Sequence, residues 1–152
     1  MSSTVRWSIA IGLLGVFVLI SRAQTQREAA ATASHRPVFI TRLYTGSDGQ
    51  THAEETEAAF TADGVLKLME VTGAELHRMS PSAAADWHRG PRRQYVITLS
   101  GSGEMEVAGG QKIPVGPGHI SLIEDTTGKG HITRNFEDRL TLQLPLTDQS
   151  SR

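Results

Sequence analysis

Short runs of apolar residues, separated by turn residues, occupy most of the chain from residue 37 onward. The runs are rich in Val, Ile, Leu, Thr and Tyr, and clusters of Gly, Pro, Asp and Ser divide them, which is typical of β-strands. No stretch has the period of a long amphipathic helix, and residues 54–60 suit one helical turn at most. The expected strands cover residues 38–45, 65–71, 74–79, 94–99, 104–107, 111–113, 119–123, 131–136 and 139–146.

The run at residues 139–146 alternates most regularly between apolar and polar positions. Its apolar positions are Leu140, Leu142, Leu144 and Leu146, and its polar positions are Arg139, Thr141 and Gln143. Because successive side chains of a strand point to opposite faces, this period predicts a strand with one wet, polar face.

Two glycine-rich turns predict β-hairpins. Gly101-Ser102-Gly103 separates two expected strands, and Gly109-Gly110 supplies the positive φ angles of a tight two-residue turn. Many short strands at such close spacing indicate an antiparallel sandwich or barrel. The sequence thus predicts one all-β domain over residues 37–147, with a short tail at 148–152.

An apolar segment without charged residues, 7–20, precedes this domain and follows Arg6. It is short for a transmembrane helix, which needs roughly 20 residues. Ser21 and Ala23 place small side chains where a signal peptidase requires them, so residues 1–23 are expected to be a cleaved signal peptide, with an uncleaved inner-membrane anchor as the alternative. Residues 24–36 show no strand pattern and are interpreted as a linker. The expected location is therefore the periplasm.

The charge balance and the lack of cysteine exclude several kinds of function. Removal of residues 1–23 would leave a net charge of about −3, whereas nucleic-acid binding requires a basic face. The chain has no cysteine, so disulfides, thiol nucleophiles and thiolate metal sites are excluded.

The candidate chemistry lies between residues 87 and 135. If the chain is extended there, His88 and Gln94 point to the same side, and His131 begins another expected strand after a glycine-rich loop. Two imidazoles and an amide at strand ends are candidate ligands for one divalent metal ion. Hydrogen bonding to an organic ligand, or to the protein itself, is the alternative role for each of them.

Four further residues are candidates for ligand binding. Arg92 and Arg93 alternate faces, so one of them is expected to enter the site and hold a carboxylate. The indole of Trp87 suits either a flat ligand at the rim or simple packing. Asp125 is placed to complete a metal site or to orient an imidazole.

These residues resemble the cupin superfamily over roughly residues 60–146. His88 takes the place of the first histidine of the first cupin motif, Gln94 the place of the glutamate, and Gly101 that of the closing glycine. The segment 126–135, with His131 and Asn135, is similar to the second motif, with Thr126 in the proline place. The pattern departs at Gly90, which stands where the second histidine is expected, and small uncharacterised single-domain cupins share several of these segments.

The resemblance implies a jelly-roll β-barrel, in many members a homodimer, with one transition metal ion held by histidines and a carboxylate. Two hypotheses for function follow. The first is an exported metal-dependent enzyme, of oxygenase, isomerase or lyase type, acting on a small oxygenated organic molecule. The second is a cupin that binds or senses a small molecule without metal or turnover. A metal-free enzyme with a histidine base oriented by Asp125 is a third possibility.

Overall fold

The computed structural model describes residues 36–81 and 86–147, which form β-strands joined by turns and loops. The expected signal peptide, almost all of the linker, and the C-terminal tail lie outside the described residues. A 3₁₀ turn, η1, spans Ala108–Gly110, and no helix in the described part of the chain has the length and apolar character needed to cross a membrane. The strands are Phe39–Thr45 (β1), Thr51–Glu57 (β2), Glu75–Met79 (β3), Gln94–Ser100 (β4), Gly103–Glu106 (β5), Lys112–Val115 (β6), Ile120–Glu124 (β7), Ile132–Asn135 (β8) and Arg139–Pro145 (β9).

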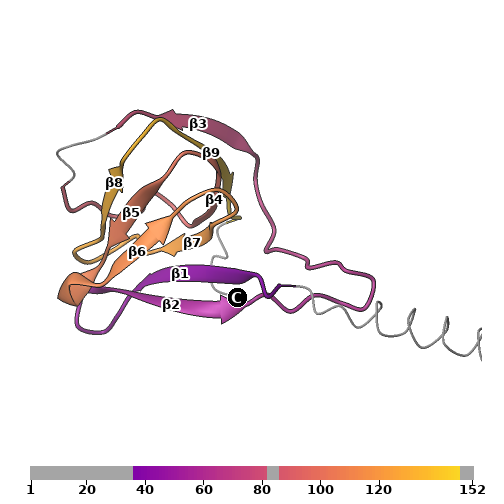
Figure 1. Ribbon diagram of the computed structural model, residues 1–152. Coiled ribbons are helices and arrows are strands. Elements are labelled where there is room, and N and C mark those ends of the chain that lie inside the picture. Colours follow the sequence, from indigo (N-terminus) through magenta and orange to yellow (C-terminus); the bar gives the residue numbers. More distant parts are fainter. Residues whose placement is uncertain (1–35, 82–85, 148–152) are drawn as a thin grey trace, which may run out of the picture. The chain divides into compact units, whose positions relative to one another are not determined.

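The strands form two sheets, and the all-β class predicted from the sequence is confirmed (Figure 1). The larger sheet has the order β2-β1-β7-β4-β9-β3, and the smaller has the order β6-β5-β8. The expectation of a wholly antiparallel fold is wrong at one place, because β1 and β7 run parallel. The barrel expected from the resemblance is not closed, since each sheet ends in its own edge strands among the described residues.

The two predicted hairpins have different outcomes. The turn at Gly109 and Gly110 joins β5 to β6 as an antiparallel pair, and both glycines have positive φ as expected. The turn is longer than the expected two residues, because η1 also includes Ala108. The turn at Gly101 does not make a hairpin, because β4 pairs with β7 and β9 whereas β5 pairs with β6 and β8. A register shift between Thr98 and Ser100 precedes this turn, and the chain there passes from one sheet to the other.

Two other expectations are wrong. The region given one helical turn instead contains most of β2, whose residues pair in continuous register with β1. Glu54, Glu55 and Glu57 are exposed there, and charged side chains of this kind protect an edge strand from pairing with another chain. Residues 65–71 form no strand. Their only ladder contact is a single bridge from Val71 to Leu146, and Val65 and Leu68 are exposed.

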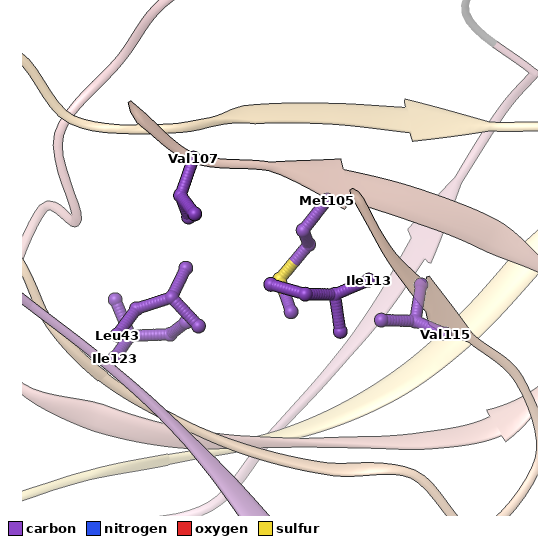
Figure 2. Close-up of a cluster of buried hydrophobic side chains, with 6 residues drawn as sticks. All are labelled: Leu43, Met105, Val107, Ile113, Val115 and Ile123. Carbon is purple, nitrogen blue, oxygen red and sulfur yellow. The ribbon is translucent and has the colours of Figure 1, made fainter. Parts of the chain in front are cut away.

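A compact apolar core fills part of the space between the sheets. Figure 2 shows Leu43 of β1 and Ile123 of β7 pointing into the same space as side chains from the smaller sheet. Met105, Val107, Ile113 and Val115 complete this cluster. Burial of these side chains is the main stabilising contribution here, at about 1.5–3 kcal/mol for each large aliphatic residue.

The outer face of the larger sheet carries a row of apolar residues that crosses five strands. Cross-strand register places them side by side in the order Leu76, Leu142, Ile97, Ile120 and Ile40. Leu76 is 67% exposed, and the other four are half-buried. The leucine side of β9 therefore belongs to the outer face of the sheet.

One carboxylate joins three parts of the larger sheet. Glu124, at the end of β7, accepts a hydrogen bond from Arg42 Nε of β1 at 2.6 Å and from Arg93 Nε, just before β4, at 3.0 Å. Burial raises the pKa of Glu124, but the hydrogen bonds from Arg93 and Arg42 outweigh this effect, so the pKa lies below its ordinary value. The charged carboxylate is thus the form that stabilises the folded state.

Replacing Glu124 with Gln should lower the free energy of unfolding at neutral pH by about 1–3 kcal/mol, because two arginines lose their charged acceptor. Since the folded-state pKa is depressed, this stabilisation is present above the ordinary value of 4.5 and is lost as pH falls through the folded-state pKa. Urea unfolding of parent and variant should therefore converge at acidic pH. The exposed Glu57→Gln is the matched control, and equal effects of both substitutions would contradict the prediction.

Candidate functional site

A cavity of about 480 Å³ lies between the sheets, beside the apolar core. Inward-facing side chains from strands of both sheets form its wall, as the two-residue period of a strand requires. The lining includes both predicted histidines and the predicted glutamine. Its polar residues are His77, Asp86, His88, Gln94, Thr98, Ser121, His131, Thr133, Asn135, Arg139 and Gln143.

His88 and His131 meet at one end of this cavity. Their backbones form an isolated antiparallel bridge, with His88 N–H donating to His131 O at 2.9 Å and His131 N–H donating to His88 O at 2.8 Å. The bridge requires Gly130, because a Cβ at that position would lie 2.1 Å from His88 O and the residue has a φ of +82°. The ring centroids are 4.6 Å apart, so the two imidazoles predicted to converge do so.

Asp125 lies behind His131 and does not line the cavity. Its carboxylate is 0% exposed and accepts hydrogen bonds from His131 Nδ1 at 2.6 Å and from Thr51 Oγ1 at 3.0 Å. Of the two roles expected for Asp125, the geometry matches that of orienting an imidazole.

The hydrogen bonds of both rings leave the same nitrogen available. Because Asp125 accepts at Nδ1 of His131, and the carbonyl of Asp86 accepts at Nδ1 of His88 at 3.0 Å, each Nδ1 carries the proton. In a neutral ring Nε2 then bears the lone pair, and within the described residues no hydrogen bond reaches it. An oxygen acceptor on Nδ1 is the usual support for an imidazole that binds a metal ion through Nε2.

Gln94 is buried and lines the cavity, but its amide oxygen already has a partner. Arg92 Nε donates to Gln94 Oε1 at 3.0 Å, and the same guanidinium donates to Glu75 Oε2 at 2.6 Å. The contact with a cation reduces the electron density that this oxygen offers to a metal ion. Arg92 thus contacts Gln94 and Glu75 and is not a lining residue of the cavity.

The other two predicted ligand-binding residues also lie away from the cavity wall. Arg93 is bound to Glu124, and its second guanidinium nitrogen also contacts the sulfur of Met69. Trp87 is half-buried beneath Lys129, whose Nζ lies 3.7 Å from the ring centroid, a cation–π contact.

The close packing around Gly90 leaves no room for a side chain at this position. Gly90 is buried, and its N–H donates to Asp125 O at 3.1 Å. A Cβ at this position would lie 2.5 Å from Ile123 Cγ2. Ile123 of the apolar core therefore occupies the space that a side chain at residue 90 would need.

The far end of the cavity contains polar residues that the sequence pattern of residues 139–146 assigned to a solvent-exposed face. Arg139 lines the cavity and is 4% exposed, and Thr141, two residues along the same face of β9, is 0% exposed. The polar face of the 139–146 run is thus the inner face of the sheet. The period-two alternation of residues 139–146 predicted a polar face, but the sequence did not show that this face lines a cavity.

His119 and Asn135 belong to the same end. Burial lowers the pKa of His119; Glu55 raises it, and Arg139 lowers it further. Asn135, at the end of β8, donates from Nδ2 to Ser80 O at 3.5 Å. His77 also lines the cavity and is paired with Glu75 at 2.9 Å.

Comparison with known proteins identifies no relative: no protein-family model matches the chain, and no curated protein matches its sequence. Within residues 36–81 and 86–147, no group of three or more His, Cys, Asp or Glu side chains is placed to hold a metal ion. The donor set that faces the cavity at the His88 end is therefore two imidazoles with one neighbouring amide.

Replacing Gly90 with Ala should destabilise the protein by about 1–3 kcal/mol, because the added methyl group overlaps Ile123. Gly90→His, which adds a larger side chain, should be more damaging. Gly116→Ala is the control, since a Cβ there meets nothing within 4 Å. Thermal unfolding of the three variants checks this, and a Gly90→Ala protein as stable as the control would contradict the packing argument.

Proposed function

We propose that this chain is an exported cupin-type protein that holds a divalent transition metal ion through His88 and His131 and acts on a small oxygenated organic molecule. The observation that carries the proposal is the pair of imidazoles in the cavity wall, each with Nδ1 bound to oxygen and Nε2 left available. Two imidazoles suit ions such as iron, nickel, copper or zinc. Bound there, the ion would supply Lewis-acid activation of a ligand oxygen.

The proposed jelly-roll topology is supported by the two-sheet architecture. The chain crosses between the sheets after β4, and the site lies between them, where the resemblance to cupins expects it. Export to the periplasm is supported by the apolar segment 7–20 and the small residues before position 24. An uncleaved segment would instead anchor the protein to the inner membrane.

The roles of the protein groups follow from their contacts. Asp125 fixes the ring orientation of His131 and keeps the proton on Nδ1, while Thr51 holds the carboxylate in place. The carbonyl of Asp86 does the same for His88. Gln94 would add its amide oxygen to the donor set only in place of the hydrogen bond from Arg92, and Val96 and Met105 offer apolar surface to the ligand. Together these side chains would position a small molecule against the two histidines.

A metal-free protein that binds or senses a small molecule is the second candidate. The observation that favours it is the hydrogen bond from Arg92 to the oxygen of Gln94, which engages the third donor. In that case Nε2 of each histidine accepts a hydrogen bond from the ligand directly. The same oriented His131 also suits a general base, the third possibility.

Metal analysis of the purified full-length chain, prepared without a histidine tag or chelator, distinguishes these candidates. We expect a near-stoichiometric transition metal in the parent and a large loss in His88→Ala and in His131→Ala. Asp125→Asn should weaken metal affinity about 10–100-fold, the usual effect of losing a carboxylate that supports a metal-bound histidine. His52→Ala is the matched control, because His52 pairs with Asp48 in a surface turn.

A metal-free and well-folded parent would overturn the metal proposal and favour the second candidate. Retention of the metal in both His88→Ala and His131→Ala would place the ion elsewhere. Circular dichroism of each variant separates loss of the ligand from loss of the fold.

We also propose that the protein forms a homodimer, as the resemblance implies. The support is the apolar row on the outer face of the larger sheet, in which Leu76 is the most exposed member. A continuous row of apolar side chains of this kind is more typical of an interface than of a solvated surface.

If this face forms the dimer, Leu76→Asp should shift the protein toward monomer, with the dissociation constant raised by about tenfold or more, because a buried charge would have no partner. Sedimentation equilibrium measures this. Lys112→Ala, which changes an exposed residue of β6 in the smaller sheet, is the control. A monomeric parent would contradict the proposal.

A further inference from the structure

Four buried polar atoms without a hydrogen-bond partner gather at the end of the cavity away from His88. Among the described residues these atoms are Arg139 Nε, Thr141 Oγ1, Asn135 Oδ1 and His119 Nε2. The only other such side-chain atom, Asp125 Oδ1, lies at the His131 end. Buried polar groups are normally satisfied, so a local cluster of unsatisfied ones calls for an explanation.

Register shows that the four residues face the same region. Arg139 and Thr141 lie two residues apart on one face of β9, and Thr141 pairs with Thr98 of β4. Thr98 N–H in turn donates to His119 O, which places His119 in the next position across the sheet. The fourth residue, Asn135, approaches from the smaller sheet.

A hydrogen bond to the residue that follows β3 places Asn135 near Arg139. Its Nδ2 donates to Ser80 O, and Ser80 follows Met79, the register partner of Arg139. Both Asn135 and Arg139 line the cavity. Arg139 and Asn135 therefore belong to the cavity wall, whereas Thr141 and His119 lie on the same inner face of the larger sheet without lining the cavity.

Arg139 is the charged member and lacks a counter-ion. Within the described residues its guanidinium donates a hydrogen bond only to the sulfur of Met79, at 3.6 Å, and forms no ion pair with a carboxylate. Burial lowers the pKa of Arg139, whereas the carboxylates around Arg42 raise the pKa of that arginine. A buried guanidinium without an anion is costly, and an anionic ligand would remove that cost.

We infer that the Arg139 end of the cavity binds the carboxylate of a small organic acid. A carboxylate matches the planar fork of a guanidinium, which can donate two parallel hydrogen bonds to it. The single guanidinium, with no lysine in the lining, suits a monoanion better than a phosphate. The carboxylate role that the sequence suggested for Arg92 or Arg93 thus passes to Arg139.

This inference rests on the proposed function in that it names the ligand class for the same cavity. His131 and Asn135 are four residues apart on or beside β8, about 13 Å at a strand rise of ~3.3 Å per residue. Side chains reach inward at both ends, and Val96 and Met105 line the cavity. The space between the two ends suits a short carbon chain or a single ring, with the carboxylate at Arg139 and an oxygen function at the histidines.

Calorimetric titration of the full-length chain with matched acid and amide pairs tests the inference. The probes are hexanoate with hexanamide, benzoate with benzamide, and phenylacetate with phenylacetamide, so that each pair differs mainly in charge. For at least one pair the carboxylate should bind about tenfold more tightly than the amide, as expected for a charge-assisted fork. Arg139→Gln should remove that preference, and Arg78→Gln, an exposed arginine paired with Asp138, should leave it unchanged.

The inference is overturned if no pair shows a preference in the parent, or if Arg139→Gln retains it. Thermal unfolding of Arg139→Gln and Arg139→Met provides a second measurement. Because the ligand-free cation lacks a counter-ion, both variants should unfold at a temperature equal to or above that of the parent. A large fall in both would show that Arg139 is structural, and would equally overturn the inference.

Metal content measured on the same preparations separates this inference from the proposed function. A metal-free parent that prefers carboxylates would contradict the metal site and leave the carboxylate site standing. A metal-loaded parent that shows no preference for carboxylates would support the metal site and contradict the carboxylate site. The metal content of Arg139→Gln should equal that of the parent, since Arg139 contacts neither His88 nor His131.

Discussion

The buried carboxylate of Asp125 is the interaction on which the site depends. It accepts from Thr51 at the start of β2 and from His131 beside β8, so it connects the larger sheet to the smaller one. The backbone carbonyl of the same residue accepts from Gly90. Oδ2 of this buried carboxylate accepts both side-chain hydrogen bonds, while Oδ1 has no partner among the described residues, and burial makes the bonds to Oδ2 important for keeping the charge inside the protein. The position of His131 is therefore fixed by the folding of three distant segments, and His88 follows through the backbone bridge.

The larger sheet is polar toward the interior and apolar toward the outside over much of its width. On β9, Arg139, Thr141 and Gln143 face inward, while the leucines between them face outward. A sheet usually buries its apolar face, because burial of apolar surface stabilises the fold. The inner face of the larger sheet thus lines a polar cavity, while apolar side chains on its outer face remain partly exposed.

The sequence predicted the strands better than their pairing. Eight of the nine strands lie where alternation and turn residues place them, because those signals act over a few residues. The turn at Gly101 was misread since the glycines that suit a hairpin also suit a crossing between sheets; only the contacts of β4 with β7 and β9 decide between them. The parallel neighbour of β1 is likewise a long-range choice. At the site, motif spacing found His88 and His131, but the partners of Arg92 and Arg93 lie far away in the chain at Glu75 and Glu124, beyond the reach of local pattern.

The interior has two parts: an apolar core that stabilises the fold, and a polar cavity that is proposed to bind a ligand. Around Leu43 and Ile123 the sheets pack through apolar side chains, and there even Gly90 leaves no room for a methyl group. Beside this core, the Arg139 end leaves buried polar atoms unsatisfied, each at a cost of about 1–3 kcal/mol. A marginally stable domain of this size tolerates such a wall only because the apolar half compensates for it. A ligand that satisfies those atoms would bind the folded state alone, so occupancy of the cavity and stability of the fold are thermodynamically linked.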